Sequence, residues 1–140
     1  MTPVKTTTPE RALAAAAAEM FGAFDVAGKD CCRTAGAAFE ALWGVNPVVG
    51  ADYTTHLGAL RFLRRYGGAD ACHDALASRA GLVACEPGPG VIGAVRVPEG
   101  TSPLPWALGV HIQGEEWAVM GYSGLNIVRG PARAWGLPWA

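Results

Sequence analysis

Cys31 is the residue of this sequence whose local setting favours nucleophilic chemistry. It follows Asp30, a residue type that commonly caps a helix, so Cys31 is expected in the first helical turn. Free backbone N–H groups and the helix dipole stabilise an anion there and favour the attacking thiolate form, and Arg33 adds a positive charge nearby. The alternative is that Cys31 and Cys32 are small residues buried where the helix meets a sheet, which the local sequence alone favours.

A cysteine nucleophile also needs a general base, and imidazole is the usual one. The sequence has three histidines: His56 and His73 fall on expected helices, and His111 falls in an expected strand. We interpret His56 and His73 as surface or interface residues.

Capping and turn residues indicate the elements that position these side chains. Thr8 with Pro9, then Asp30, then Thr54 or Thr55, and then Asp70 mark helix starts, and glycines mark the helix ends. After residue 81, prolines exclude long helices, and strand-like segments lie between turns. We expect helices at about residues 8–21, 30–44, 54–66 and 70–80, and strands at 91–97, 107–113, 117–122 and 125–128.

This order predicts an α+β fold in which N-terminal helices pack on a C-terminal, mostly antiparallel sheet. No linker or repeat divides the chain, so we expect one domain over residues 8–140, preceded by a flexible N-terminus at residues 1–7.

The composition excludes several classes of protein. With 51% hydrophobic and 16% charged residues, the chain of 140 residues can form a core and carries too little charge for a disordered protein. A net charge of −1 gives no overall basic field for nucleic acid. The alanine-rich run at 12–18 is too short to cross a bilayer and lacks signal-peptide features, which predicts synthesis in a cytoplasm without stable membrane insertion.

The cysteines are expected to be free thiols without a metal. Synthesis in a reducing compartment disfavours disulfides. Neither the adjacent pair of Cys31 and Cys32 nor the adjacent pair of Cys72 and His73 has the two-to-four-residue spacing of a zinc site. We therefore expect no metal and no cofactor.

An ordered set of short motifs resembles the NlpC-like (papain-like) cysteine peptidases, and most closely a phage and prophage branch of tail-assembly proteins of unassigned function. The resemblance covers roughly residues 20–137, and it implies a papain-like, NlpC-type domain. In the order of that family, the sequence has Asp30-Cys31, Gly44-Val45-Asn46-Pro47, Tyr53, Gly58-Ala59-Leu60, Gly67-Gly68, Leu108-Gly109-Val110 and Trp135.

The resemblance also indicates that the catalytic base is missing. Active members begin a strand with His-Val-Gly-Ile, and the equivalent stretch here begins with Ala107. His111 shares a strand face with Ala107, but it lies roughly 13 Å further along the strand, which makes it a weak candidate base. We therefore expect a degenerate cysteine-peptidase fold in a structural tail-tip or tail-assembly protein of a tailed phage. The alternative is an active cysteine hydrolase that cuts peptidoglycan stem peptides during infection.

The C-terminal residues are candidates for a docking surface. Trp135, Leu137 and Trp139 form an apolar strip, and tryptophan is favoured at the centres of interfaces. The alternative is a chain end that folds back over the sheet. From the resemblance, the expected partners are other virion tail proteins, such as hub, baseplate or tail-tip subunits. The expected location is the host cytoplasm during synthesis and then the virion tail.

Overall fold

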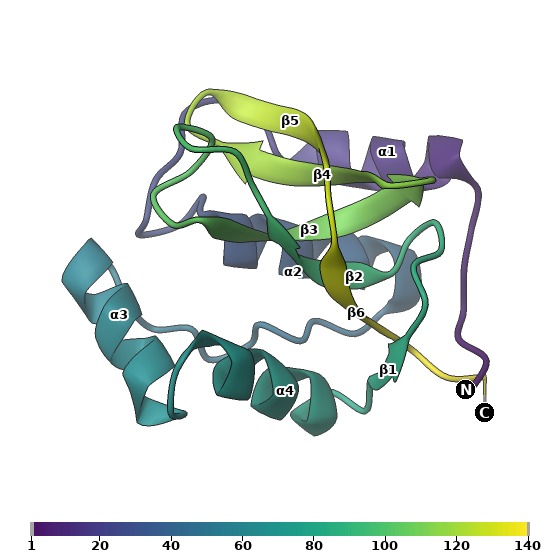
Figure 1. Cartoon of the computed structure of the whole chain (residues 1–140), viewed down its shortest axis with the longest axis horizontal. Helices are drawn as coiled ribbons and strands as arrows, with labels where there is room; N and C mark the ends of the chain where they lie inside the picture. The colour runs from purple at the N-terminus through teal and green to yellow at the C-terminus, as the bar shows by residue number, and fades with distance from the viewer. Residues whose placement is uncertain (1, 140) are drawn as a thin grey trace.

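The computed structural model describes residues 2–139, in which four helices precede a six-stranded antiparallel sheet (Figure 1). The predicted α+β class is confirmed. The helices are α1 (Pro9–Glu19), α2 (Cys31–Trp43), α3 (His56–Arg65) and α4 (Ala69–Arg79), and the strands are β1 (Val83–Cys85), β2 (Ile92–Arg96), β3 (Trp106–Gln113), β4 (Glu116–Gly121), β5 (Gly124–Arg129) and β6 (Ala132–Gly136).

Side-chain caps start three of the helices at the predicted places. Thr8, Asp30 and Thr55 each accept a hydrogen bond from a backbone N–H in the first turn of α1, α2 and α3. The Asp30 carboxylate accepts from the N–H of Arg33 at 2.9 Å. The helix α2 ends at Gly44, whose φ of 78° is the left-handed conformation that glycine adopts without strain.

The strands form one sheet in the order β1-β6-β2-β3-β4-β5. The central hairpins follow the chain, whereas β6 returns across the molecule to pair with both β2 and β1. Sequence analysis missed β1 and β6. Both are short, and their pairing joins segments about fifty residues apart, which no local pattern reports.

The main core includes side chains from both faces of the sheet, and α1 and α2 cover one of these faces (Figure 1). Its largest fully buried side chains include Phe39 of α2, Met20 after α1, and Trp117 of β4. Trp117 packs over Gly93 of β2, where a Cβ atom would lie 2.5 Å from the indole ring. A side chain at position 93 would therefore displace the tryptophan.

A second, smaller cluster joins α3 and α4 to the segment before them. It consists of Tyr53, Phe62, Cys72 and Leu76. Phe62 is the one residue of α3 that is buried. The helix α3 therefore lies at the periphery, packed mainly against α4 (Figure 1).

The two ends of the described chain are paired with each other. Val4 forms a β-bridge with Pro138, and the N–H of Lys5 donates to the carbonyl of Leu137 at 2.8 Å. Val4 and Lys5 thus make contacts within the segment of residues 1–7 that we expected to be flexible, and Met1 of that segment lies outside the described residues.

The three residues of the predicted docking strip differ in their burial. Trp135 lies in β6 and belongs to the core, so it is not available to a partner. Leu137 is half-buried against the core, and Trp139 is 63% exposed. The alternative, a chain end folded back over the sheet, therefore describes Trp135 and Leu137. Within residues 2–139, no helix has the length and apolar character needed to cross a membrane.

Candidate functional site

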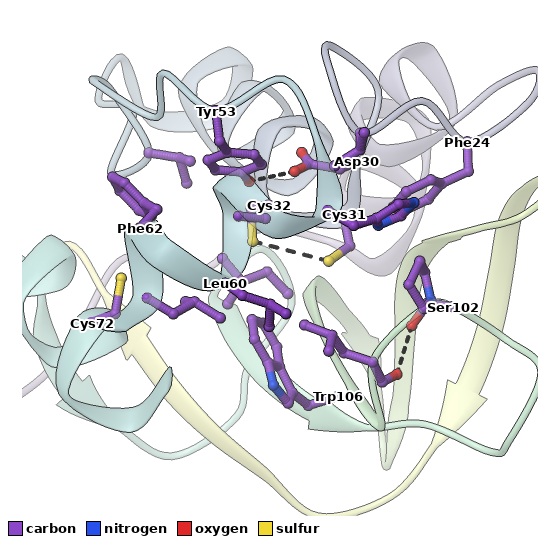
Figure 2. A pocket seen from close by; sticks show the side chains of 18 of the residues that line it. Phe24, Asp30, Cys31, Cys32, Tyr53, Leu60, Phe62, Cys72, Ser102 and Trp106 are labelled. Carbon is purple, nitrogen blue, oxygen red and sulfur yellow. Dashed lines mark hydrogen bonds between the residues drawn. The ribbon is translucent and has the colours of Figure 1, made fainter. Parts of the chain in front are cut away.

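Cys31 is the first residue of α2, as predicted, and it lines a cavity of about 370 Å³ (Figure 2). The walls come from α2, α3, α4, strand β3 and the loop before it. Most of the lining side chains are apolar, among them Phe24, Val26, Val48, Leu60, Phe62, Leu63, Leu76, Leu104, Trp106 and Leu108. A cavity of this size and character is typical of a ligand site.

The two adjacent thiols face each other inside this cavity. Their Sγ atoms are 4.0 Å apart, and Cys31 is only 8% exposed. The hydrogen bond with Cys31, together with burial, raises the pKa of Cys32 well above its ordinary value. Cys32 therefore remains a neutral thiol at physiological pH.

Asp30 connects α2 to the segment that precedes α3. Besides capping α2, its carboxylate accepts a hydrogen bond from the Tyr53 hydroxyl. Burial raises the pKa of Tyr53, as does the nearby Asp30 carboxylate, so the phenol remains a donor. This contact holds the Tyr53 ring on the cavity wall.

Arg33 is engaged with backbone carbonyls rather than with the thiol. Its guanidinium donates to the carbonyls of Val26 at 2.6 Å, Ala51 at 2.9 Å and Tyr53 at 2.5 Å. It also lies 4.3 Å from the centre of the Tyr53 ring and 3.7 Å from the Asp30 carboxylate. Arg33 thus acts as a clamp that holds the chain before α2 and the chain before α3 together.

The strand β3 presents different residues to Cys31 than we expected. Trp106 and Leu108 line the cavity, whereas Ala107 is fully buried and does not line it. Successive side chains of a strand point to opposite faces, so Ala107 lies on the far face of β3. The position that faces the cysteine is therefore held by Trp106 and Leu108, and the expectation that Ala107 stands there is corrected.

The structure does not bring His111, the weak candidate base, to the cavity that Cys31 lines. It is buried on the same face as Ala107, does not line the cavity, and packs edge-on against Trp117 with ring centres 5.0 Å apart. Its Nε2 atom is hydrogen-bonded to the carbonyl of Gly114 at 2.7 Å. The role of His111 is to close the turn between β3 and β4.

The other two histidines line the cavity, which sequence analysis missed. His56 is the exposed first residue of α3. His73 of α4 is buried against Trp106, with ring centres 4.5 Å apart, and burial lowers its pKa to about 4. The spacing of His73 with Leu76 and Ala77, one helical turn further on, was the signal for an inward-facing residue.

These groups do not form a catalytic dyad in the described residues. Over 2–139, neither ring nitrogen of His73 has a hydrogen-bond partner, and Cys31 shares its hydrogen bond with Cys32 rather than with an imidazole. All four cysteines are free thiols, and no group of three potential metal ligands gathers in the described part of the chain. The arrangement is suited to enclosing an apolar group beside a neutral thiol.

A family model described as a domain of unknown function, DUF6950, matches residues 5–137. No curated protein and no solved structure matches the chain.

Proposed function

The chain belongs to the DUF6950 family, and from this starting point we propose that it is a papain-like domain of NlpC type that has become a structural tail-tip or tail-assembly protein of a tailed phage. In this proposal the peptidase site is degenerate, and its cavity binds a ligand instead of supporting peptide cleavage. A fold outlasts its chemistry because function depends on the site and not on the fold.

One observation carries the proposal: β3 turns Trp106 and Leu108 toward the cavity that Cys31 lines. In an NlpC-like peptidase the corresponding strand supplies the histidine that takes the proton from the cysteine. An indole and an isobutyl group accept no proton, so this wall gives Cys31 no base. The same two side chains supply apolar surface, which favours binding.

The tail role rests on the ordered motifs that the sequence shares with the phage branch. Its partners would be hub, baseplate or tail-tip subunits, and the protein would move from the host cytoplasm to the virion tail. The test is mass spectrometry of tails purified from the phage that carries the gene. We expect this chain at a fixed ratio to the other tail proteins, and its absence from purified tails would refute the tail role.

The loss of chemistry is tested on the purified chain. We expect no cleavage of peptidoglycan stem peptides, and the same result for Cys31→Ala. Cleavage by the wild type that Cys31→Ala abolishes would refute the degenerate site.

A second function, a cysteine hydrolase that cuts stem peptides, is favoured by the fact that His56 and His73 line the same cavity as Cys31. For this function, His56 would have to approach the thiol through a movement of α3. Stem-peptide cleavage that is lost in both Cys31→Ala and His56→Gln would support it. His111→Gln serves as the control, because His111 lies outside the cavity.

A further inference from the structure

We propose that the cavity and the adjoining face of α3 bind a short peptide segment of a partner protein, with an apolar anchor residue in the cavity and acidic residues on one side of the anchor. This inference rests on the proposed non-catalytic role of the site and names the chemistry of its partner.

The helix α3 has two adjacent stripes. One stripe, at helical spacing, lines the cavity and consists of His56, Ala59, Leu60 and Leu63. The next stripe consists of Leu57, Leu60, Arg61 and Arg64, and all four are exposed. Residues three and four apart are neighbours on a helix surface, so Leu60 joins the two stripes at the cavity edge. Leu60 and Trp106 both line the cavity (Figure 2).

The apolar part of this surface is open to a ligand. Leu57 is 57% exposed and Leu60 is 46% exposed. Tyr122, which lines the cavity from the end of β4, is 50% exposed. Exposed apolar side chains that continue into an apolar cavity are typical of a binding surface.

The charges of the rim select the partner. Within residues 2–139, Arg61 and Arg64 are in no ion pair, whereas Arg65 pairs with Asp52 at 3.3 Å. On the other rim, Asp25 is exposed between two lining residues, Phe24 and Val26. Acidic residues of a bound peptide are therefore expected at the α3 side of its anchor and disfavoured at the Asp25 side.

A peptide fits these observations better than an anionic membrane. Lipid-binding patches usually have about four to eight basic residues, each contributing about 1 kcal/mol. The helix α3 has three arginines, one of them paired, on a chain with a net charge of −1. The concave cavity between helix and strand also favours a discrete side chain over a flat lipid surface.

The experiment selects ligands from a random short-peptide library displayed on yeast, using the full chain as bait. We expect enrichment of peptides with an aromatic or aliphatic anchor and acidic residues on one side of it. An enriched peptide is then labelled, and its binding is measured by fluorescence anisotropy. Selection that enriches nothing, or enriches peptides without this charge pattern, overturns the proposal.

Variants locate the binding surface. Leu60→Ser, and separately the double variant Arg61→Glu with Arg64→Glu, should each weaken binding by about tenfold or more. Leu13→Ser on α1, and the double variant Arg11→Glu with Arg96→Glu, change exposed residues of the same types elsewhere and should leave binding unchanged. Circular dichroism confirms that each variant is folded. Equal loss in the control variants, or no loss in the α3 variants, overturns the proposal.

Two further measurements separate the other occupants. The first is sedimentation with phosphatidylglycerol vesicles. If the chain sediments with the vesicles and the double variant Arg61→Glu with Arg64→Glu does not, the surface binds a membrane, and the proposal is overturned. If the chain self-associates and Leu60→Ser abolishes this self-association, the surface binds a second copy of the chain, and the proposal is overturned. Stem-peptide cleavage that requires Cys31 refutes the proposed function, whereas failed peptide selection without cleavage refutes only this inference.

Discussion

The α2 wall of the cavity and the α3 wall differ in what holds them in place. The helix α2 packs on the sheet, buries six of its thirteen residues, and is tied at its first turn by Asp30 and by the Arg33 clamp. The helix α3 buries Phe62 alone and packs mainly on α4. The thiols of Cys31 and Cys32 therefore lie on the tightly packed helix α2. The exposed leucines and arginines lie on α3, which has few buried contacts.

This difference indicates which wall of the cavity can change its position when a ligand binds. Local opening has the lowest free energy where few apolar side chains are buried, so α3 is expected to move before α2. A ligand can then be accommodated by a shift of α3 while Cys31, Trp106 and Leu108 keep their places. The predictions below probe the two walls in order of expected effect.

The largest effect is expected for a matched pair of phenylalanines. Phe39→Ala removes a fully buried ring of α2 and should lower the free energy of unfolding by about 3–5 kcal/mol. Phe62→Ala removes the buried ring of α3 and should cost less, since the small cluster can relax around it. Urea unfolding and amide hydrogen exchange distinguish them. The expected difference between α2 and α3 is refuted if Phe62→Ala lowers the free energy of unfolding more than Phe39→Ala does. It is also refuted if Phe62→Ala speeds amide exchange in α2 as much as in α3.

Acid should weaken the contact between α4 and β3. Burial lowers the pKa of His73 from 6.5 to about 4, so between these values the unfolded chain binds the extra proton. Stability from this group is present above pH 6.5 and is lost as the pH falls toward 4, by up to roughly 3 kcal/mol.

Thermal unfolding across this pH range measures the loss. In His73→Phe the corresponding part of the pH dependence should disappear, whereas His56→Gln, which changes an exposed ring, should retain it. An unchanged pH profile in His73→Phe would contradict the assignment.

The Arg33 clamp should have the next effect. Arg33→Met leaves the carbonyls of Val26, Ala51 and Tyr53 without their donor, at a cost of about 2 kcal/mol. Arg33→Lys should restore only part of this, because an ammonium lacks the planar fork of a guanidinium. Denaturant unfolding gives the values. Arg129→Met, at an exposed position, is the control, and an equal loss there would show that the clamp has no special role.

The smallest effect is expected on the outer stripe of α3. Leu60→Ser should change the free energy of unfolding by no more than about 0.5 kcal/mol, because the side chain is already 46% exposed. Differential scanning calorimetry checks this. A loss comparable to that of Phe62→Ala would mean that Leu60 supports the fold rather than a binding surface.

The sequence predicted features that depend on neighbouring residues. Asp30 and Thr55 identified helix starts because capping involves only the next few residues. Long-range pairing was not predictable in this way. The strand β6 exists because it lies between β1 and β2, so Trp135 appeared to belong to a free tail although it fills the core.

The sequence predicted only the part of the candidate site that depends on neighbouring residues. Cys31 at the start of α2 follows from its cap, whereas the strand face opposite it depends on register. A one-residue difference exchanges the faces, which is why Trp106 and not Ala107 meets the cavity. The inward position of His73 depends on how α4 packs against β3, and local spacing alone does not determine the partner of a helix face.

The pairing of Val4 with Pro138 has a practical consequence for handling the molecule. Both residues of this bridge lie at one side of the domain, and α3 lies at the other (Figure 1). A tether attached beyond either end should therefore hold the domain to a surface in one orientation, with the arginine-bearing helix turned away from the support. Immobilisation through an N-terminal or a C-terminal tag should thus leave the cavity mouth equally accessible to a ligand in solution.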